Sequence, residues 1–402
     1  MRDGWNTTEL GKIADFIDYR GKTPPKQSFG IPLITAKIIK KNRVQEPNEF
    51  IASNFYDEWM RRGIPNKGDV IFTTEAPLGE VALIKTDEKQ AFAQRIIILQ
   101  AKADILDSTF LFYTLQYSKT KSRIESRSSG TTVFGIKSAE LKKVKIDYPS
   151  FPEQRAISAT LSCLDDKIEL NNKISANLEA QAQAIFKSWF VDFEPFQDGE
   201  FVDSELGPIP KGWRVGSLGD IARYVTERMP TKYCNAENYI STENMLANKQ
   251  GVVSAYSLPS TPAASRYVER DILISNIRPY FKKIWFANKI GGCSNDVLVI
   301  RARHKYLSGL LYSILYSDAF FDYATVTSKG TKMPRGDKSA IMKYLIAFPP
   351  SLEHDVHIQQ LAIIVMQFQK KISELHKENQ NLAALRDTML PKLMSGEIEV
   401  PV

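Results

Sequence analysis

The chain has 402 residues, enough for two or three domains that each bury a hydrophobic core. Its 43% hydrophobic and 25% charged residues exclude a disordered chain, and its apolar runs are too short to span a bilayer. The formal net charge of +7 favours a polyanionic partner without requiring one.

The chain contains an internal repeat, which constrains its architecture. Gly4-Trp5 precedes Leu10-Gly11, and Gly212-Trp213 precedes Leu218-Gly219 at the same interval. Further matches, in the same order in both halves, are residues 69–73 with 271–275, 95–102 with 296–303, 111–118 with 310–317, 130–131 with 330–331, and 137–138 with 338–339. Long-period self-similarity indicates repeated domains, so we expect one kind of domain to do the same task at two places.

Each copy has the pattern of a mixed α/β globule. The short β-like runs of the first copy, separated by glycine-containing turns, are residues 31–34, 69–73, 81–84 and 95–100. A helix follows them, with Asp107 or Ser108 as its N-cap. We therefore expect one globular domain over residues 1–150 and a second over residues 212–350.

A long helix with a heptad seam is expected after each globule, over residues 151–190 and 351–394. Pro152 suits the first turn of the first helix. The expected seam residues are Ile157, Leu161, Leu164, Ile168, Leu178 and Ile185 in the first helix, and Ile358, Leu361, Val365, Phe368, Ile372, Leu375 and Leu382 in the second. Asn171 and Ser175 interrupt the first seam with polar side chains.

Chain connectivity predicts how the helices pair. The acidic residues 191–211 have the composition of a linker, and residues 395–402 form a short tail. Because the second helix starts from the second globule, its apolar stripe can be covered by packing back along the first helix. The expected fold is α+β, with two similar globules joined by two antiparallel coiled-coil helices in a pseudo-two-fold dumbbell. The alternatives are independent helices on separate cores, or a seam used for homodimerisation.

The sequence carries little that could support catalysis or metal binding. It has no glycine-rich phosphate loop of standard spacing and no tetrapeptide of an amino-methyltransferase. His354 and His357 could bind a metal from one helical turn, but no cysteine or third histidine lies close in sequence, so a solvated helix start is the expectation. Residues 140–142 have a nuclease-like Glu-x-Lys form without an upstream Pro-Asp. We expect a non-catalytic binding protein without a metal or cofactor of its own.

Two features bear on the cellular compartment. The N-terminal residues lack the apolar core of a secretory signal. Cys163, Cys234 and Cys293 are isolated in the sequence and odd in number, as suits a reducing environment. We therefore expect a cytoplasmic protein.

Basic and hydroxyl side chains are the candidates for contact with DNA. Lys and Arg contact phosphates, and a glycine beside hydroxyl groups permits close approach of the backbone. The expected DNA-binding residues are Lys22, Thr23, Lys37, Arg43, Ser129 and Thr131 in the first half, and Arg228, Lys232, Asn276, Arg278, Lys282, Lys329, Thr331 and Lys332 in the second. A single basic residue is more often simply solvated, but here basic Gly-Thr segments recur at matched places.

Four motifs point to one protein family. They are Gly-Trp followed by Leu-Gly at the start of each half, residues 148–157 (YPSFPEQRAI), residues 189–195 (WFVDFEP) and residues 205–213 (ELGPIPKGW). Together with the repeat, they make the chain similar to the specificity subunit of a type I restriction-modification enzyme over essentially its whole length.

The resemblance implies recognition of DNA sequence without catalysis. Each globule would read one half of a bipartite, asymmetric site in double-stranded DNA, and the helices would set the spacing. The chain would dock two modification subunits, which bind S-adenosylmethionine and methylate adenine N6, and through them restriction subunits that use ATP and Mg²⁺. The docking residues that the resemblance implies are Gln154, Arg155, Phe186, Trp189 and Phe190. Residues 349–354 (PPSLEH) lack the Gln-Arg pair, so docking through that pair is in doubt in the second copy.

Two rival functions remain open at this point. A DNA-independent scaffold with two protein-binding heads predicts no salt-dependent affinity for DNA. A self-contained enzyme with an unrecognised site predicts turnover by the chain alone.

Overall fold

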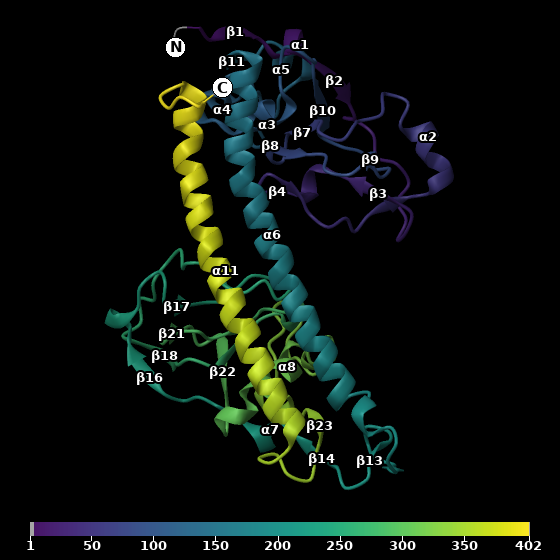
Figure 1. Ribbon diagram of the computed structural model, residues 1–402, viewed down its shortest axis with the longest axis vertical. Coiled ribbons are helices and arrows are strands. Elements are labelled where there is room, and N and C mark those ends of the chain that lie inside the picture. The colour runs from purple at the N-terminus through teal and green to yellow at the C-terminus, as the bar shows by residue number, and fades with distance from the viewer. Residues whose placement is uncertain (1–3, 402) are drawn as a thin grey trace. The chain divides into compact units, whose positions relative to one another are not determined.

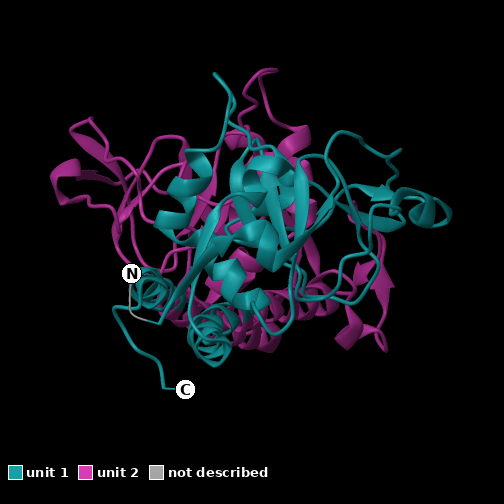
Figure 2. Cartoon of the chain, turned by 90° about the horizontal axis from the view of Figure 1, so that it is seen from above, with its two compact units in different colours: residues 1–169, 379–402 teal, residues 170–378 magenta. Residues whose placement is uncertain are grey.

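The computed structural model describes residues 4–401 and divides into two compact units (Figure 2). Unit 1 holds the described residues up to Glu169 together with those from Asn379 onwards, and unit 2 holds Leu170–Glu378. Each unit therefore combines a globule with one part of each long helix.

A four-stranded antiparallel sheet lies at the centre of the unit 1 globule. Its strand order is β2 (Ala14–Asp18), β10 (Ile96–Ala101), β7 (Val70–Thr74), β8 (Leu78–Leu83). Successive side chains of a strand point to opposite faces. Val70 and Phe72 accordingly belong to the core that includes α3 (Ser108–Gln116), whereas Ile71 belongs to a second core. Burial on both faces explains why this strand is a continuous apolar run rather than an alternating one.

Shorter elements complete unit 1 (Figure 1). A two-stranded sheet pairs β1 (Asn6–Glu9) with β11 (Lys145–Tyr148), and a three-stranded sheet has the order β6 (Phe50–Ile51), β3 (Ile31–Ile34), β9 (Ala91–Phe92). The remaining elements are the hairpin β4 (Ile39–Lys40) and β5 (Arg43–Val44), and the helices α1 (Leu10–Ile13), α2 (Tyr56–Trp59), α4 (Ser118–Glu125) and α5 (Ser138–Lys142).

Unit 2 repeats this plan, as the sequence repeat predicted. Its central sheet has the order β15 (Ala222–Tyr224), β22 (Val297–Ala302), β19 (Ile272–Ser275), β20 (Ile284–Phe286). The pair β14 (Arg214–Ser217) and β23 (Leu345–Phe348) matches β1 and β11. The matching helices are α7 (Leu218–Ile221), α8 (Ser308–Tyr316), α9 (Asp318–Val326) and α10 (Lys338–Met342). The segment before this globule carries the small hairpin of β12 (Phe201–Val202) and β13 (Ile209–Pro210).

The two globules differ in their second sheet. In unit 2 this sheet has four strands, in the order β16 (Arg228–Pro230), β18 (Ala263–Tyr267), β21 (Gly291–Cys293), β17 (Tyr239–Ile240), against three in unit 1. This is also the region in which the two halves of the sequence match least. The central sheets are therefore the repeated framework, and the second sheets are the part specific to each copy.

The long helices α6 (Phe151–Phe190) and α11 (Val356–Ser395) pack against one another, antiparallel, within each unit. In unit 1, Ile157 shares a core with Leu393, and Asp165 pairs with Arg386 at 2.6 Å. In unit 2, Asn171 donates to Glu378 at 3.0 Å, and Glu179 accepts from Gln369 at 2.6 Å. Residues further along α6 contact residues earlier in α11, in both units. The antiparallel pairing of the two helices is therefore confirmed.

Some of the expected seam residues also pack into the globules: Ile157 and Leu161 belong to the core of unit 1, and Ile358, Leu361 and Val365 to that of unit 2. Ile157, Leu161, Ile168, Ile358, Leu361, Val365, Ile372 and Leu375 are buried, while Leu164, Leu178, Ile185, Phe368 and Leu382 are partly buried. Helix α8 also packs closely on α11, because Gly309 lacks a side chain. A Cβ atom at Gly309 would lie 2.5 Å from the Cα atom of Ala362.

Local capping decides where α11 begins and ends. The sequence predicted a start at residue 351, but the helix begins at Val356 because Asp355 is its N-cap. The side chain of Asp355 accepts a hydrogen bond from the amide of Ile358 at 2.9 Å. At the other end, Gly396 adopts φ 73° and the amide of Glu397 donates to the carbonyl of Lys392 at 2.9 Å. A left-handed glycine of this kind commonly ends a helix.

A buried carboxylate lies where α6 and α11 meet the unit 2 globule. Oε1 of Glu179 accepts hydrogen bonds from the hydroxyl of Tyr312 at 3.0 Å and from Nε2 of Gln369 at 2.6 Å. Oε2 is also buried, and no hydrogen-bond partner for it occurs among residues 4–401. Burial therefore raises the pKa of Glu179 above its ordinary value.

The raised pKa predicts how stability depends on pH. The folded state holds the proton of Glu179 at pH values where the unfolded chain has released it. The free energy of unfolding should therefore fall as pH rises from the unfolded pKa through the folded one. We expect Glu179→Gln to remove this pH dependence of the free energy of unfolding. The variant should therefore become increasingly more stable than the unaltered protein as pH rises towards neutrality. Urea unfolding between pH 4 and 8 measures this, and a stability difference that does not change with pH would contradict it.

Candidate nucleic-acid interface

Both units contain the same closed loop, residues 129–135 in unit 1 (the first Gly-Thr loop) and residues 329–335 in unit 2 (the second Gly-Thr loop). The amide of Ser129 donates to the carbonyl of Gly135 at 2.9 Å, and the amide of Gly135 donates back at 3.0 Å. Lys329 and Arg335 exchange the same pair of bonds at 2.8 and 2.9 Å. The repeated Gly-Thr sequence therefore forms a repeated structure.

A glycine is required for the loops to close. Gly130 adopts φ 141° and Gly330 adopts φ 97°, values that other residues rarely take. A Cβ atom at Gly130 would lie 2.0 Å from the carbonyl oxygen of Val133. The following residues, Thr131 and Thr331, are exposed.

Each loop is hydrogen-bonded, through the residue that follows it, to the end of an inner strand of its sheet, β7 in unit 1 and β19 in unit 2. In unit 1, the amide of Ile136 donates to the carbonyl of Thr74, the last residue of β7, at 3.0 Å. In unit 2, the amide of Gly336 donates to the carbonyl of Asn276, just after β19, at 3.0 Å. The loops thus occupy equivalent places on equivalent sheets.

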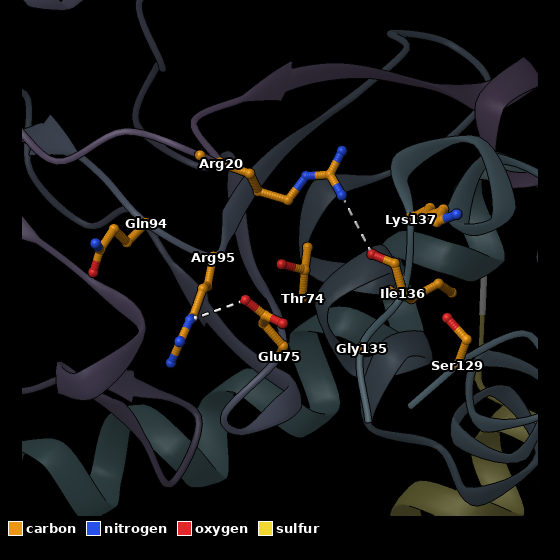
Figure 3. A pocket seen from close by; sticks show the side chains of 10 residues that line it. Arg20, Thr74, Glu75, Gln94, Arg95, Ser129, Gly135, Ile136 and Lys137 are labelled. Carbon is orange, nitrogen blue, oxygen red and sulfur yellow. Dashed lines mark hydrogen bonds and ion pairs between the residues drawn. The ribbon is translucent and has the colours of Figure 1, made fainter. Parts of the chain in front are cut away.

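A cavity of about 500 Å³ adjoins the first Gly-Thr loop (Figure 3). Its lining includes Arg20, Glu75, Arg95, Ser129 and Lys137. Nε of Arg20 donates to Asp18 at 2.8 Å. Burial alone would raise the pKa of Asp18, but the hydrogen bonds and charge of Arg20 outweigh it and lower that pKa. Two cations of the cavity are therefore held by carboxylates, Arg20 by Asp18 and Arg95 by Glu75.

The structure brings together only some of the residues predicted in unit 1. Ser129 and Thr131 lie in the first Gly-Thr loop. Lys22 and Thr23 are exposed, and Lys22 lines a separate hollow of about 340 Å³. Lys37 lies in the short 3-10 helix Ala36–Ile38 and Arg43 at the start of β5, on segments separate from the first Gly-Thr loop.

In unit 2, Asn276, Arg278, Lys329, Thr331 and Lys332 lie in or beside the second Gly-Thr loop. The amide of Arg278 donates to the carbonyl of Pro334 at 2.7 Å. Oδ1 of Asn276 and Nε of Arg278 are buried and have no hydrogen-bond partner among the described residues. Buried polar atoms that lack a hydrogen-bond partner beside a surface loop are candidates for contact with a ligand.

Three further predicted residues of unit 2 are engaged by neighbouring groups. Arg228 donates to Asn295 at 2.7 Å, and Lys282 pairs with Asp318 at 2.6 Å. Lys232 is exposed, with its ammonium 5.1 Å from the ring centroid of Tyr233.

Lys329 also has a partner within its own unit. Its ammonium lies 2.6 Å from Asp337. The hydrogen bond from Lys329, followed by those from the amides of Ala340 and Ser339, lowers the pKa of Asp337. The side chain of Lys329 is 80% exposed, so its ammonium can leave Asp337 for water or phosphate at little cost.

Comparison with known proteins gives a consistent family. The family model of the type I restriction modification DNA specificity domain matches residues 2–180. The MjaIX specificity subunit of Methanocaldococcus jannaschii is 29% identical over 98% of this chain and 94% of its own length. The HindI specificity subunit of Haemophilus influenzae is 23% identical over 83% of this chain and 87% of its own length. Residues 2–180 belong to the family of the type I restriction modification DNA specificity domain, and the chain as a whole is similar to type I restriction enzyme specificity subunits.

The fold of the chain agrees with that of a solved specificity subunit. The crystal structure of the type I restriction-modification S subunit from M. genitalium aligns with a TM-score of 0.57, at 16% identity, over 99% of this chain and 96% of that one. Specificity subunits are non-catalytic, and the family implies DNA binding and assembly with other subunits. Within residues 4–401, no group of three or more His, Cys, Asp or Glu could hold a metal ion, and no helix is long and apolar enough to cross a membrane.

Three of the residues that the resemblance placed on the docking surface are buried within the chain. Gln154 is 0% exposed, and its side chain bonds the carbonyls of Ile105 and Pro149 at 3.0 Å and the amide of Asp107 at 2.9 Å. Phe186 and Phe190 belong to the core of unit 2. Gln154 ties α6 to the unit 1 globule, and Phe186 and Phe190 pack α6 into the core of the unit 2 globule. Arg155 is exposed, and Trp189 is partly buried against His357.

The sequence did not single out Gln94 and Arg95, which line the cavity of unit 1. Both are non-glycine residues with positive φ, 46° and 62°. The repeat aligns Arg95 with Asp296, and this alignment was the available signal. The signal is weak because the repeat places an acidic residue, not a second basic one, at the position that matches Arg95.

Proposed function

We propose that this chain, as a specificity subunit, reads a split, asymmetric site in double-stranded DNA, with one half read by each globule. The observation that carries the proposal is the pair of equivalent Gly-Thr loops on equivalent sheet ends. A repeated loop that carries cations and hydroxyls suits phosphate contact, and the divergent second sheets beside it suit two different half-sites. Residues 1–150 and 212–350 are the two target-recognition domains in this proposal.

The remaining segments have supporting roles. Residues 151–190 and 351–394 set the spacing between the half-sites, residues 191–211 are the linker and residues 395–402 the tail. Two modification subunits dock on the helices, with Arg155 and Trp189 as the accessible residues, and restriction subunits join through them. S-adenosylmethionine, ATP and Mg²⁺ bind those partners, and the complex acts in the cytoplasm.

The residues proposed to contact DNA fall into two groups. Those in or beside the Gly-Thr loops are Ser129, Thr131, Asn276, Arg278, Lys329, Thr331 and Lys332. Those on other segments are Lys22, Thr23, Lys37, Arg43, Arg228, Lys232 and Lys282. The first group has the stronger support, because its members share one structural feature across both units.

Single-molecule methylome sequencing of cells that express this chain with its modification subunits tests the function. The expected result is one asymmetric split motif with N6-methyladenine in both halves. No new motif from a complex that demonstrably assembles would favour the DNA-independent scaffold instead.

The second Gly-Thr loop gives a quantitative prediction. Lys329→Ala with Lys332→Ala should reduce the dependence of log affinity on log salt by about two units, since each lysine neutralises about one phosphate. Titration of the assembled complex with duplex DNA at several salt concentrations measures this slope. Lys211→Ala with Lys305→Ala, exposed lysines on other elements, is the charge-matched control. An equal loss of slope in the control would mean that only net charge matters.

A further inference from the structure

An arginine–carboxylate pair stands at each Gly-Thr loop, with the two partners exchanged between the units. In both units one partner of the pair lies on the turn that leads into β10 or β22, the strand next to β7 or β19. The amide of Thr74 donates to the carbonyl of Arg95 at 2.8 Å, and the amide of Asn276 donates to the carbonyl of Asp296 at 2.8 Å. Arg95 and Asp296 therefore occupy the same place in the repeated fold.

In unit 1 this turn supplies the arginine. Nε of Arg95 lies 3.0 Å from Oε1 of Glu75, which follows β7 and bridges to Gly135 of the first Gly-Thr loop. Figure 3 shows this contact beside the cavity, with Gln94 on the same turn. The side chain of Arg95 is 49% exposed, so its outer nitrogens can reach a ligand.

In unit 2 the same turn supplies the acid. Oδ1 of Asp296 lies 3.0 Å from Nη2 of Arg335, which closes the second Gly-Thr loop. Arg335 is 57% exposed. The orphaned Oδ1 of Asn276 and Nε of Arg278 belong to the strand end to which this loop is tied.

Such exposed ion pairs contribute little to stability. Their recurrence in both units with the two partners exchanged calls for another reason. A carboxylate that binds one nitrogen of a guanidinium fixes its plane and leaves other N–H donors directed outwards. A guanidinium held in this way suits bidentate contact with O6 and N7 of guanine in the major groove.

We propose that Arg95 and Arg335 each read a guanine, one in each half-site, with Glu75 and Asp296 as their positioning residues. This inference rests on the proposed function and deepens it. The arginine belongs to the turn before β10 in unit 1 and to the second Gly-Thr loop in unit 2. The two guanidinium groups therefore approach the DNA from different elements, which is one physical cause of asymmetry between the half-sites.

The experiment compares methylomes of the assembled complex carrying Arg95→Gln, Arg335→Gln or neither change. Arg95→Gln should relax one base position in one half of the motif, and Arg335→Gln one position in the other half. The loss of discrimination at that position should be roughly tenfold to a hundredfold. Each variant is the control for the other, because the unaltered half-site reports that the complex still folds and assembles.

Glu75→Gln and Asp296→Asn test the positioning role. Each should reduce discrimination at the same position as its arginine variant, while leaving the salt dependence of DNA binding unchanged. An unchanged motif with a shallower salt slope in the arginine variants would mean phosphate contact and overturn the inference. An unchanged motif and slope would reduce the pairs to surface ion pairs. Absence of any split motif from the original complex would instead overturn the proposed function itself.

Discussion

Insertion of one heptad into each long helix is expected to move methylation to a site whose spacer is about three base pairs longer. Helix α6 is a single helix of 40 residues, and α11 has the same length. Seven residues add roughly 10 Å of helix, and each base pair of DNA spans about 3.4 Å. A seven-residue insert also preserves the phase of the seam, which an insert of arbitrary length would not.

The antiparallel pairing fixes where the two inserts belong. Inserts after Asn172 in α6 and after Lys377 in α11 lie at the same level of the helix pair and keep the Asn171–Glu378 contact. Methylome sequencing gives the new spacer directly. An insert in α6 alone is the control, because it misaligns the two seams and should abolish methylation. Retention of the original spacer by the doubly lengthened subunit would show that the helices do not set the distance.

The second large effect is expected from Asp271→Ala, at the start of β19. Asp271 is 1% exposed and accepts hydrogen bonds from Nε and Nη2 of Arg301 at 2.6 and 2.8 Å, and from the amide of Val268 at 2.8 Å. Removal of one partner of a buried ion pair costs about 3–5 kcal/mol, because the other charge stays behind. Glu227, 2.7 Å from Arg301, should keep the loss near the lower end, about 3 kcal/mol.

The repeat supplies a matched control for this prediction. Asp69 occupies the equivalent place in unit 1, but its partner is the neutral amide of Gln100 at 2.6 Å, together with the amide of Asn66 at 2.7 Å. Asp69→Ala should therefore cost less, about 1–3 kcal/mol. Urea unfolding, with hydrogen exchange to assign each transition to its unit, measures both losses. Equal losses would mean that the charge of Arg301 adds nothing to the effect.

The repeat and the long helices could be predicted because they depend on local periodicity. Matched segments such as residues 69–73 and 271–275 became equivalent strands, and the apolar residues at heptad spacing became the helix seam. Each position contributes to such a pattern independently of the rest of the fold. The start of α11 was misplaced by five residues because a single cap, Asp355, decides it.

The candidate site was only partly predictable, because charge in a sequence does not say which groups are near one another. Lys22 and Ser129 were predicted together but line different hollows, and Lys282 pairs with Asp318 on α9. Gln154 was expected at a surface from its motif, yet it is fully buried and bonded to three backbone groups. Arg95 was not predicted as a site residue because its partner, Glu75, lies 20 residues away in the sequence and becomes a neighbour only through the sheet.

By itself the sequence determined the number of copies and the long helices, since these follow from repeated and periodic patterns of residue type. Its motifs indicated the family, and chain connectivity predicted the antiparallel pairing of the helices. Tertiary structure alone decided which polar groups meet. Two strands that are adjacent in a sheet place Arg95 beside Glu75 and Arg301 beside Asp271, and the strength of those contacts depends on distances and burial that no local pattern encodes.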